Sequence, residues 1–107
     1  MNIQLSGQHI EITDAIRSSV EEKIKLLERH FSGMVDFHVN LKVEKTKHIA
    51  EATVHVRGHT LFATTDRSDM YAAIDDLMNK LNHQIIKHKE KLRSHHKKEV
   101  VHHTLRK

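Results

Sequence analysis

Residues 36–44 read DFHVNLKVE, and the architecture of the chain follows from them. Every second residue is apolar, which is the period of a β-strand that buries one face and leaves the other to solvent. The apolar residues are Phe37, Val39, Leu41 and Val43. Because such a strand must cover its apolar face with a second layer, the flanking sequence has to supply further strands and helices.

Three more strands are expected around this one. Residues 50–57 and 60–65 repeat the alternation, and Gly58-His59 between them predicts a tight hairpin turn. Residues 45–48 are expected to form the polar turn that follows the strand at residues 36–44. Residues 2–6 are expected to form a short strand earlier in the chain. The polar face of the sheet is expected to be open to solvent or to a partner. It carries His38, Lys42, Glu51, Thr53, His55 and Arg57.

Two stretches have apolar residues at the three- and four-residue steps of a helix. Thr13 can cap the first helix, which Gly33 is expected to stop, and Ser68 or Asp69 can cap the second. The apolar stripe of the first helix is Ile16, Val20, Ile24, Leu27 and Phe31. That of the second helix is Met70, Ile74, Leu77, Leu81, Ile85, His88 and Leu92.

The resulting order, β-α-β-β-β-α, predicts an α+β fold with a four-stranded sheet. The first two strands are joined through a helix and should be parallel, and the remaining strands should form an antiparallel meander. Each helix has one apolar stripe, so both can cover the same face of the sheet, as in double-stranded-RNA-binding domains. Residues 1–94 are predicted to form this single domain, and residues 95–107 a basic, His-rich, disordered tail.

The composition argues against several kinds of protein. The chain has 107 residues and no Cys, which leaves no disulfide framework and no thiolate metal site. It has no apolar run of about 18 residues and no signal-peptide pattern, which predicts a cytoplasmic protein without a membrane span. A Gly-rich phosphate loop and a nucleophile elbow are both missing, and adjacent Asp75 and Asp76 point apart on a helix. We therefore expect a protein that is not an enzyme.

Positive charge is concentrated toward the end of the sequence. Residues 1–79 contain nine Lys/Arg and twelve Asp/Glu, whereas residues 80–107 contain nine and two, so their net charges are −3 and +7. Such polarity steers a protein toward a polyanion, although a simple solvated helix face explains the lysines nearly as well. Aromatic residues make up only 4%, and three of the four look like core residues, so no platform for stacking single-stranded bases is expected. No helix has the pattern of a base-reading recognition helix. Recognition of RNA shape and backbone is therefore predicted.

A helical wheel of the last helix places cations on both sides of its apolar stripe. One flank carries Lys80, Lys87, Lys91 and Lys98, with Gln84 beside them. The opposite flank carries Lys89 and Arg93, and the first helix presents Lys25 and Arg29 outward. Because the helices should lie side by side, their cations are expected to form one continuous strip.

The twelve His residues raise the question of metal binding. Adjacent His pairs in the tail diverge by about 100° on a helix, so the two rings of a pair do not chelate a metal ion well together. His88 lies on the apolar stripe, and His38 and His55 could be cross-strand neighbours on the open face. We predict no designed metal site and no cofactor.

Several motifs resemble one known family. The second helix opens with DMYAAID at residues 69–75, the first opens with EITDAIR at residues 11–17, and LKVEK at residues 41–45 lies in a strand. The last helix continues with the lysine pattern KL…Q…KHK…KL between residues 80 and 92. Over residues 1–95 the chain resembles the short ribosome hibernation promoting factors, of the ribosome-associated inhibitor and sigma-54 modulation protein family.

The resemblance implies a function as well as the same fold. Members of this family bind the small (30S) subunit, also within the 70S ribosome, in the channel that mRNA and tRNA occupy. They block translation in non-growing cells and promote inactive ribosomes, including paired 100S particles. Basic side chains of the two helices contact the rRNA, here 16S rRNA, and no small-molecule substrate is involved. The corresponding residues of this chain are Lys23, Lys25, Arg29, Lys80, Lys87, Lys89, Lys91 and Arg93.

Toward its end the sequence departs from some family members. It shows no second domain of the kind that long members use for ribosome pairing, and its tail is basic where that of the inhibitor paralogue is acidic. The free protein is expected to be a monomer. The alternative function is a module that binds structured RNA in general, or an acidic protein, through the same face.

Overall fold

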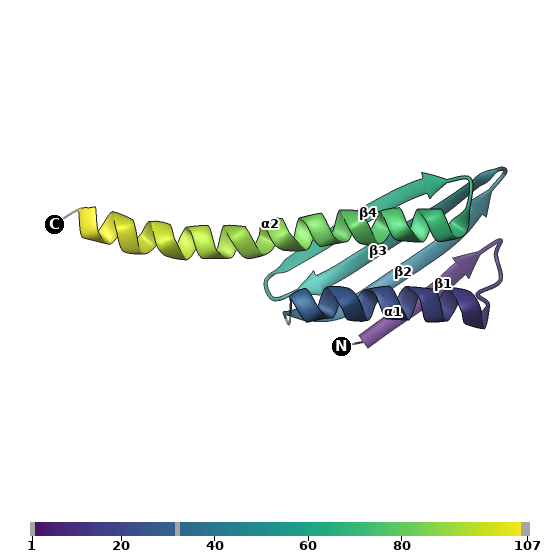
Figure 1. Ribbon diagram of the computed structural model, residues 1–107, viewed down its shortest axis with the longest axis horizontal. Coiled ribbons are helices and arrows are strands. Elements are labelled where there is room, and N and C mark those ends of the chain that lie inside the picture. Colours follow the sequence, from purple (N-terminus) through teal and green to yellow (C-terminus); the bar gives the residue numbers. More distant parts are fainter. Residues whose placement is uncertain (1, 32, 106–107) are drawn as a thin grey trace.

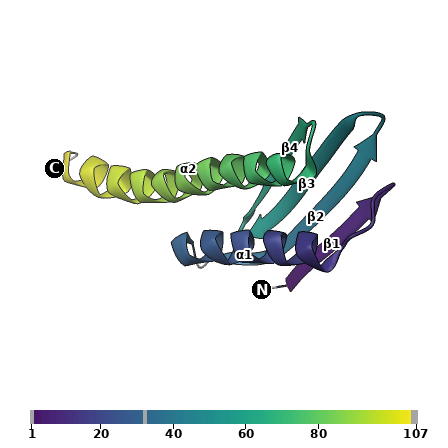
Figure 2. The same cartoon turned by 45° about the vertical axis from the view of Figure 1, so that its right-hand side comes forward.

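The computed structural model describes the backbone of residues 2–31 and 33–105, and within this set the side chains up to Leu92. The elements are β1 (Asn2–Gln8), α1 (Asp14–His30), β2 (Met34–Glu44), β3 (Lys47–Val56), β4 (His59–Arg67) and α2 (Met70–Leu105). Figures 1 and 2 show both helices on the same side of one sheet. The predicted α+β fold and its order of elements are therefore confirmed.

The sheet has the strand order β1-β2-β3-β4. β1 is parallel to β2, as the predicted crossover requires, and β2, β3 and β4 form the predicted antiparallel meander. The turn between β2 and β3 consists of residues 45–46, so it is shorter than the predicted 45–48. The turn between β3 and β4 is Arg57-Gly58. Gly58 takes a φ of 71°, a backbone angle that residues with a Cβ rarely adopt. β1 and β4 are thus the two edge strands.

Both helices begin at the predicted capping residues. The Thr13 hydroxyl oxygen accepts a hydrogen bond from the Ile16 N–H at 3.2 Å. The Asp69 carboxylate accepts one from the Ala72 N–H at 3.1 Å. Each bond satisfies an N–H group that the helix itself leaves free at its first turn.

The core lies between the helices and the apolar face of the sheet. Phe37, Val39 and Leu41 of β2 are completely buried there, as the alternation predicts. The helix stripes are buried at Ile16, Val20, Ile24, Leu27, Met70, Ile74, Leu77, Leu81 and Ile85. The predicted burial of Leu92 is wrong, since this residue is 55% exposed. The physical reason is that α2 extends beyond the sheet (Figure 1), so the later part of the helix has no sheet against which to bury an apolar side chain.

α2 continues further than the sequence suggests. The backbone is helical to Leu105, which takes α2 into the segment from residue 95 for which the sequence predicts disorder. No Gly or Pro interrupts this stretch, so the helical hydrogen bonds can continue without a break. The division of the chain at residue 94 stays a prediction. In the described part of the chain, no helix is apolar over enough length to cross a lipid bilayer.

Candidate nucleic-acid interface

The two helices run in the same direction over the sheet, so that the end of α1 lies beside the middle of α2 (Figure 1). Asp14 and Asp69 lie at the two N-termini, where negative charge is favourable, and the cations gather toward the other end. These cations are Lys25, Arg29, Lys87, Lys89 and Lys91.

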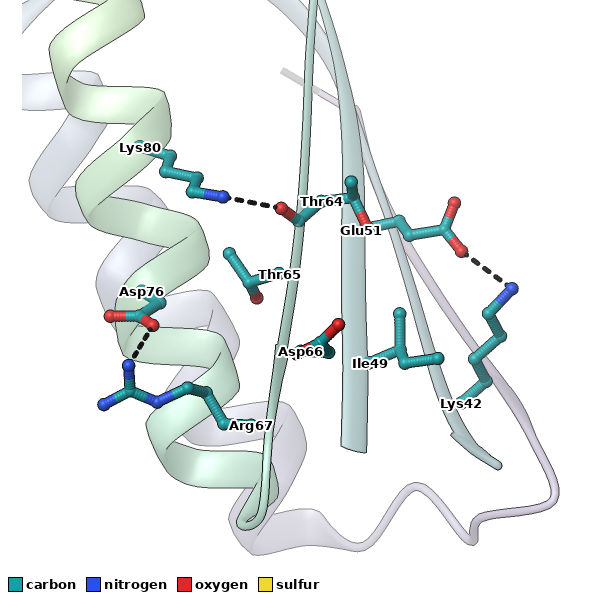
Figure 3. Close-up of a pocket in the computed structure, with 9 residues that line it drawn as sticks. All are labelled: Lys42, Ile49, Glu51, Thr64, Thr65, Asp66, Arg67, Asp76 and Lys80. Atoms are coloured by element: carbon teal, nitrogen blue, oxygen red, sulfur yellow. Dashed lines mark hydrogen bonds and ion pairs between the residues drawn. The ribbon is translucent and has the colours of Figure 1, made fainter. Parts of the chain in front are cut away.

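One flank of α2 is fastened to the edge strand β4. Lys80 donates from Nζ to the Thr64 carbonyl oxygen at 3.0 Å, a contact drawn in Figure 3. Gln84 donates from Nε2 to the Phe62 carbonyl oxygen at 2.8 Å. Both bonds satisfy carbonyl groups of an edge strand that no further strand pairs. Lys80, a predicted RNA contact, is therefore already engaged within the protein through one of its N–H groups.

Lys87 and Lys91 continue this flank toward the end of the sheet. With His59, Leu61, Gln84 and His88 they line a pocket of about 340 Å³. Both lysine side chains are exposed, and neither has a hydrogen bond or ion pair with another residue of the described set. Their ammonium groups are thus available to an external anion. The predicted grouping of Lys80, Gln84, Lys87 and Lys91 on one flank is confirmed, while their contact with rRNA stays a prediction. The side chain of Lys98, predicted on the same flank, lies outside the described residues.

The opposite flank of α2 faces α1. Lys89 donates from Nζ to the His30 carbonyl oxygen at 2.6 Å, which satisfies one of the carbonyl groups left free at the end of α1. Lys23 of α1 forms an ion pair with Asp75 of α2, with Nζ and Oδ1 2.8 Å apart. Lys23 and Lys89 therefore hold the two helices together in addition to any contact with a ligand. The side chain of Arg93, predicted on this flank, lies outside the described residues.

A groove of about 400 Å³ separates the two helices along this flank. Leu26, which the predicted apolar stripe leaves out, lies in its wall and is 53% exposed. The one continuous strip of cations expected from the sequence stays a prediction, and two of its cations, Lys23 and Lys89, connect the two helices. The groove is lined by Lys23, Leu26, Leu27, His30, Asp75, Met78, Asn79 and Asn82.

A third cluster of charged side chains surrounds the other half of β4 (Figure 3), in a pocket of about 490 Å³. Arg67 pairs with Asp76 at 2.9 Å, and Lys42 pairs with Glu51 at 3.1 Å. The hydrogen bond to Glu51 and its charge raise the pKa of Lys42 above its ordinary value. Because each of these two cations has a carboxylate partner, the pocket is less suited to a phosphate than the α2 flank with Lys87.

The expectation that three of the four aromatic residues are core residues is wrong, because two of the four, Phe62 and Tyr71, are 53% and 45% exposed. Phe62 lies on the open face of the sheet. His55 lies opposite Asp36 rather than His38, with its Nδ1 3.6 Å from the carboxylate. Among the side chains that the structure describes, no three His, Asp or Glu gather closely enough to hold a metal ion.

Both the sequence and the fold have known relatives. The family model described as sigma 54 modulation protein / S30EA ribosomal protein matches residues 3–93. A ribosome hibernation promoting factor from Azotobacter vinelandii is 50% identical over 91 residues, which cover 85% of each chain. The protein of the same name from Escherichia coli K12 is 44% identical over 95 residues, 89% of this chain and 100% of the relative.

Two solved structures share the fold. A ribosomal subunit interface protein from Coxiella burnetii superposes with a TM-score of 0.80 at 33% identity, over 84% of this chain and 99% of the other. The N-terminal domain of Thermus thermophilus Protein Y superposes with a TM-score of 0.74 at 38% identity, over 79% and 96%. The architecture derived from the alternation of residues 36–44 is thus shared with a ribosomal subunit interface protein and with the Protein Y domain.

Proposed function

Since the chain belongs to the sigma 54 modulation protein / S30EA ribosomal protein family, we propose that it is a ribosome hibernation factor. It binds the small ribosomal subunit in the channel that mRNA and tRNA occupy, blocks translation in non-growing cells and promotes inactive ribosomes of the 100S type. The names of its relatives, ribosome hibernation promoting factor and ribosomal subunit interface protein, support this proposal.

The observation that carries the proposal is the position of Lys87 and Lys91 on an unbroken helix. α2 runs from Met70 to Leu105, and its buried stripe anchors it in the core as far as Ile85. The two lysines follow directly after this anchored part, one turn apart, so they stand on a stiff support. A rigid row of cations without partners among the described side chains fits the regular charge of a nucleic-acid backbone better than a flexible arm does, because less entropy is lost on binding.

The affinity comes from phosphate contacts. Each phosphate that a Lys or Arg neutralises releases counterions from the RNA, which makes the association favourable at low salt. Lys25, Arg29, Lys87 and Lys91 supply the exposed contacts, and Lys80, Lys23, Lys89 and Arg93 complete the set. Translation is blocked by steric exclusion, because the protein fills the space of mRNA and tRNA.

The same proposal covers the setting in which the protein works. The free protein is a monomer in the cytoplasm, and its partner is the 30S subunit, alone or in the 70S ribosome, through 16S rRNA. It needs neither a cofactor nor a small-molecule substrate, since binding alone accounts for the effect.

Co-sedimentation with purified 30S, 50S and 70S particles tests this function. The protein is expected to pellet with 30S and 70S particles but not with 50S particles. Because tRNA occupies the same channel, particles filled with tRNA should retain much less of the protein. Equal pelleting with 50S particles, or binding that tRNA leaves unchanged, would contradict the proposal. If the protein still captures its partner after the RNA has been digested with nuclease, the partner is instead an acidic protein.

A further inference from the structure

Three aromatic rings meet where the end of α1, the start of β4 and the middle of α2 come together. The His59 and His88 rings are stacked, with centroids 5.4 Å apart and planes within 8° of each other. The Phe31 ring meets His88 edge-on, with 5.7 Å between centroids and an angle of 86°. Gly33 leaves space for this ring, since a Cβ there would lie 2.6 Å from the Phe31 Cζ. Contacts from three elements therefore hold the His88 ring in place.

The two histidines share their surroundings with the exposed lysines of α2. Both line the 340 Å³ pocket together with Lys87, Lys91, Gln84 and Leu61, and no carboxylate is among the lining residues. In the described part of the chain, the ion pair between a histidine and a carboxylate is that of His55 with Asp36, on the open face of the sheet.

The ring that packs against His88 from the segment just after α1 is the uncharged Phe31. Lys89, on the other flank of α2, donates to the His30 carbonyl oxygen. A proton taken up by His59 or His88 thus adds positive charge to a site that already holds two ammonium groups.

Such an arrangement couples protonation to the binding of an anion. Histidine ordinarily changes its charge near pH 6.5, within the range that cells experience. Two imidazolium rings in a stack beside two lysines repel one another as long as the pocket holds only water. An anion in the pocket removes this repulsion and accepts hydrogen bonds from the imidazolium N–H groups, so it favours the protonated form.

We propose that this pocket takes a phosphate group of the RNA backbone together with a proton, so that the His59–His88 pair strengthens RNA binding as the pH falls. The inference rests on the proposed function, because the phosphate belongs to the same RNA. The bound state holds more protons than the free state, so affinity rises as pH falls through the titration range of histidine. Above this range both states are neutral at the pair, and affinity no longer changes with pH.

Binding to purified 30S subunits at about pH 8 and about pH 6, at constant ionic strength, tests the inference on either side of the ordinary histidine range. The variant is His59→Gln, which removes one exposed ring of the stack and leaves both lysines. The matched control is His38→Gln, an exposed histidine on the other face of the sheet. Uptake of one proton allows at most a tenfold gain per pH unit, or about a hundredfold over these two units, and uptake over only part of the range gives an expected gain of roughly tenfold for the wild type. The His59→Gln variant should match the wild type at the higher pH and gain about threefold or less at the lower pH, whereas His38→Gln should behave as the wild type.

Calorimetry in two buffers of different ionisation enthalpy gives a second readout, since it measures the protons taken up on binding. At a pH near 6.5 the wild type should take up more protons than His59→Gln. Equal affinity of the wild type at both pH values would overturn the inference. The inference would also be overturned if His59→Gln and His38→Gln lost the gain in affinity at low pH to the same extent, since this would show a general effect of charging a His-rich protein. A His59→Gln variant whose affinity is reduced equally at both pH values would overturn it as well. A wild type that fails to bind 30S at either pH would instead remove the proposed function itself.

Discussion

Replacing Lys87 and Lys91 together with glutamate is expected to weaken binding to 30S subunits by about 100-fold or more. A hydrogen bond to a charged group contributes about 1.5–3 kcal/mol, and each 1.4 kcal/mol is tenfold in affinity, so two lost contacts account for this factor. The new carboxylates also repel the phosphates they face. Titration of the variant against 30S subunits in a sedimentation assay measures the change.

The fold should survive these two substitutions. Both lysines are exposed and follow the buried part of the α2 stripe, so far-ultraviolet circular dichroism and the unfolding midpoint should match those of the wild type. The matched control is Lys45→Glu with Lys47→Glu, which changes the net charge equally at the turn between β2 and β3. This turn is exposed and lies at the other end of the sheet (Figure 1). Equal weakening in both double variants would show that only net charge matters.

Replacing Phe37 with alanine is expected to lower the free energy of unfolding by about 3–5 kcal/mol. The ring is completely buried between the sheet and the helices, so its removal leaves a cavity in the core in addition to the lost apolar burial. Domains of this kind have a total stability of about 5–15 kcal/mol, so the variant should be partly unfolded at moderate temperature. Urea denaturation followed by circular dichroism gives the value.

Phe62→Ala is the control for this experiment. The same ring is removed from the open face of the sheet, where the residue is 53% exposed. The expected loss is below about 1 kcal/mol, as for surface substitutions in general. Similar losses for Phe37→Ala and Phe62→Ala would mean that the helices do not cover the face of the sheet assigned to them.

Local patterns in the sequence were sufficient for the order of the elements and the topology, but not for the end of α2. The alternation at residues 36–44 reports a strand with one buried face, and such a strand pairs here with β1 and β3 on its two sides. Thr13 and Asp69 were predictable as caps because a short side chain with an oxygen, just ahead of an apolar stripe, can accept a hydrogen bond from a free N–H group of the first turn. The crossover between β1 and β2 follows from chain connectivity alone.

The exposure of individual residues was harder to predict. Leu61 and Ala63 point to the core, so the period of two places Phe62 on the open face, against the general tendency of aromatic residues to be buried. Leu92 continues the apolar spacing of α2, but the spacing does not say where the sheet beneath the helix ends. Burial depends on the facing layer, which lies far away in the sequence.

The candidate site was predictable only in part, and for the same reason. A helical wheel places Lys87 and Lys91 on one flank because that arrangement is internal to the helix. The hydrogen bond from Lys89 to the His30 carbonyl oxygen joins residues 59 positions apart, so no local pattern in the sequence predicts it. The His59–His88 stack likewise depends on how β4 meets α2. Sequence therefore suggests which side chains are cations, and the packing of helices decides which of them remain available.

The salt dependence of binding to 30S subunits is the sharpest test of the proposal that Lys87 and Lys91, on the stiff α2 helix, meet ribosomal phosphates. With Lys25 and Arg29 they provide four exposed contacts, and each should add about 0.7–0.9 to the slope of log affinity against log salt concentration. The wild type should therefore show a slope of about −3 or steeper, and the double glutamate variant a slope smaller in magnitude by about two. A slope near zero for the wild type, or the same slope for both proteins, would contradict the proposal.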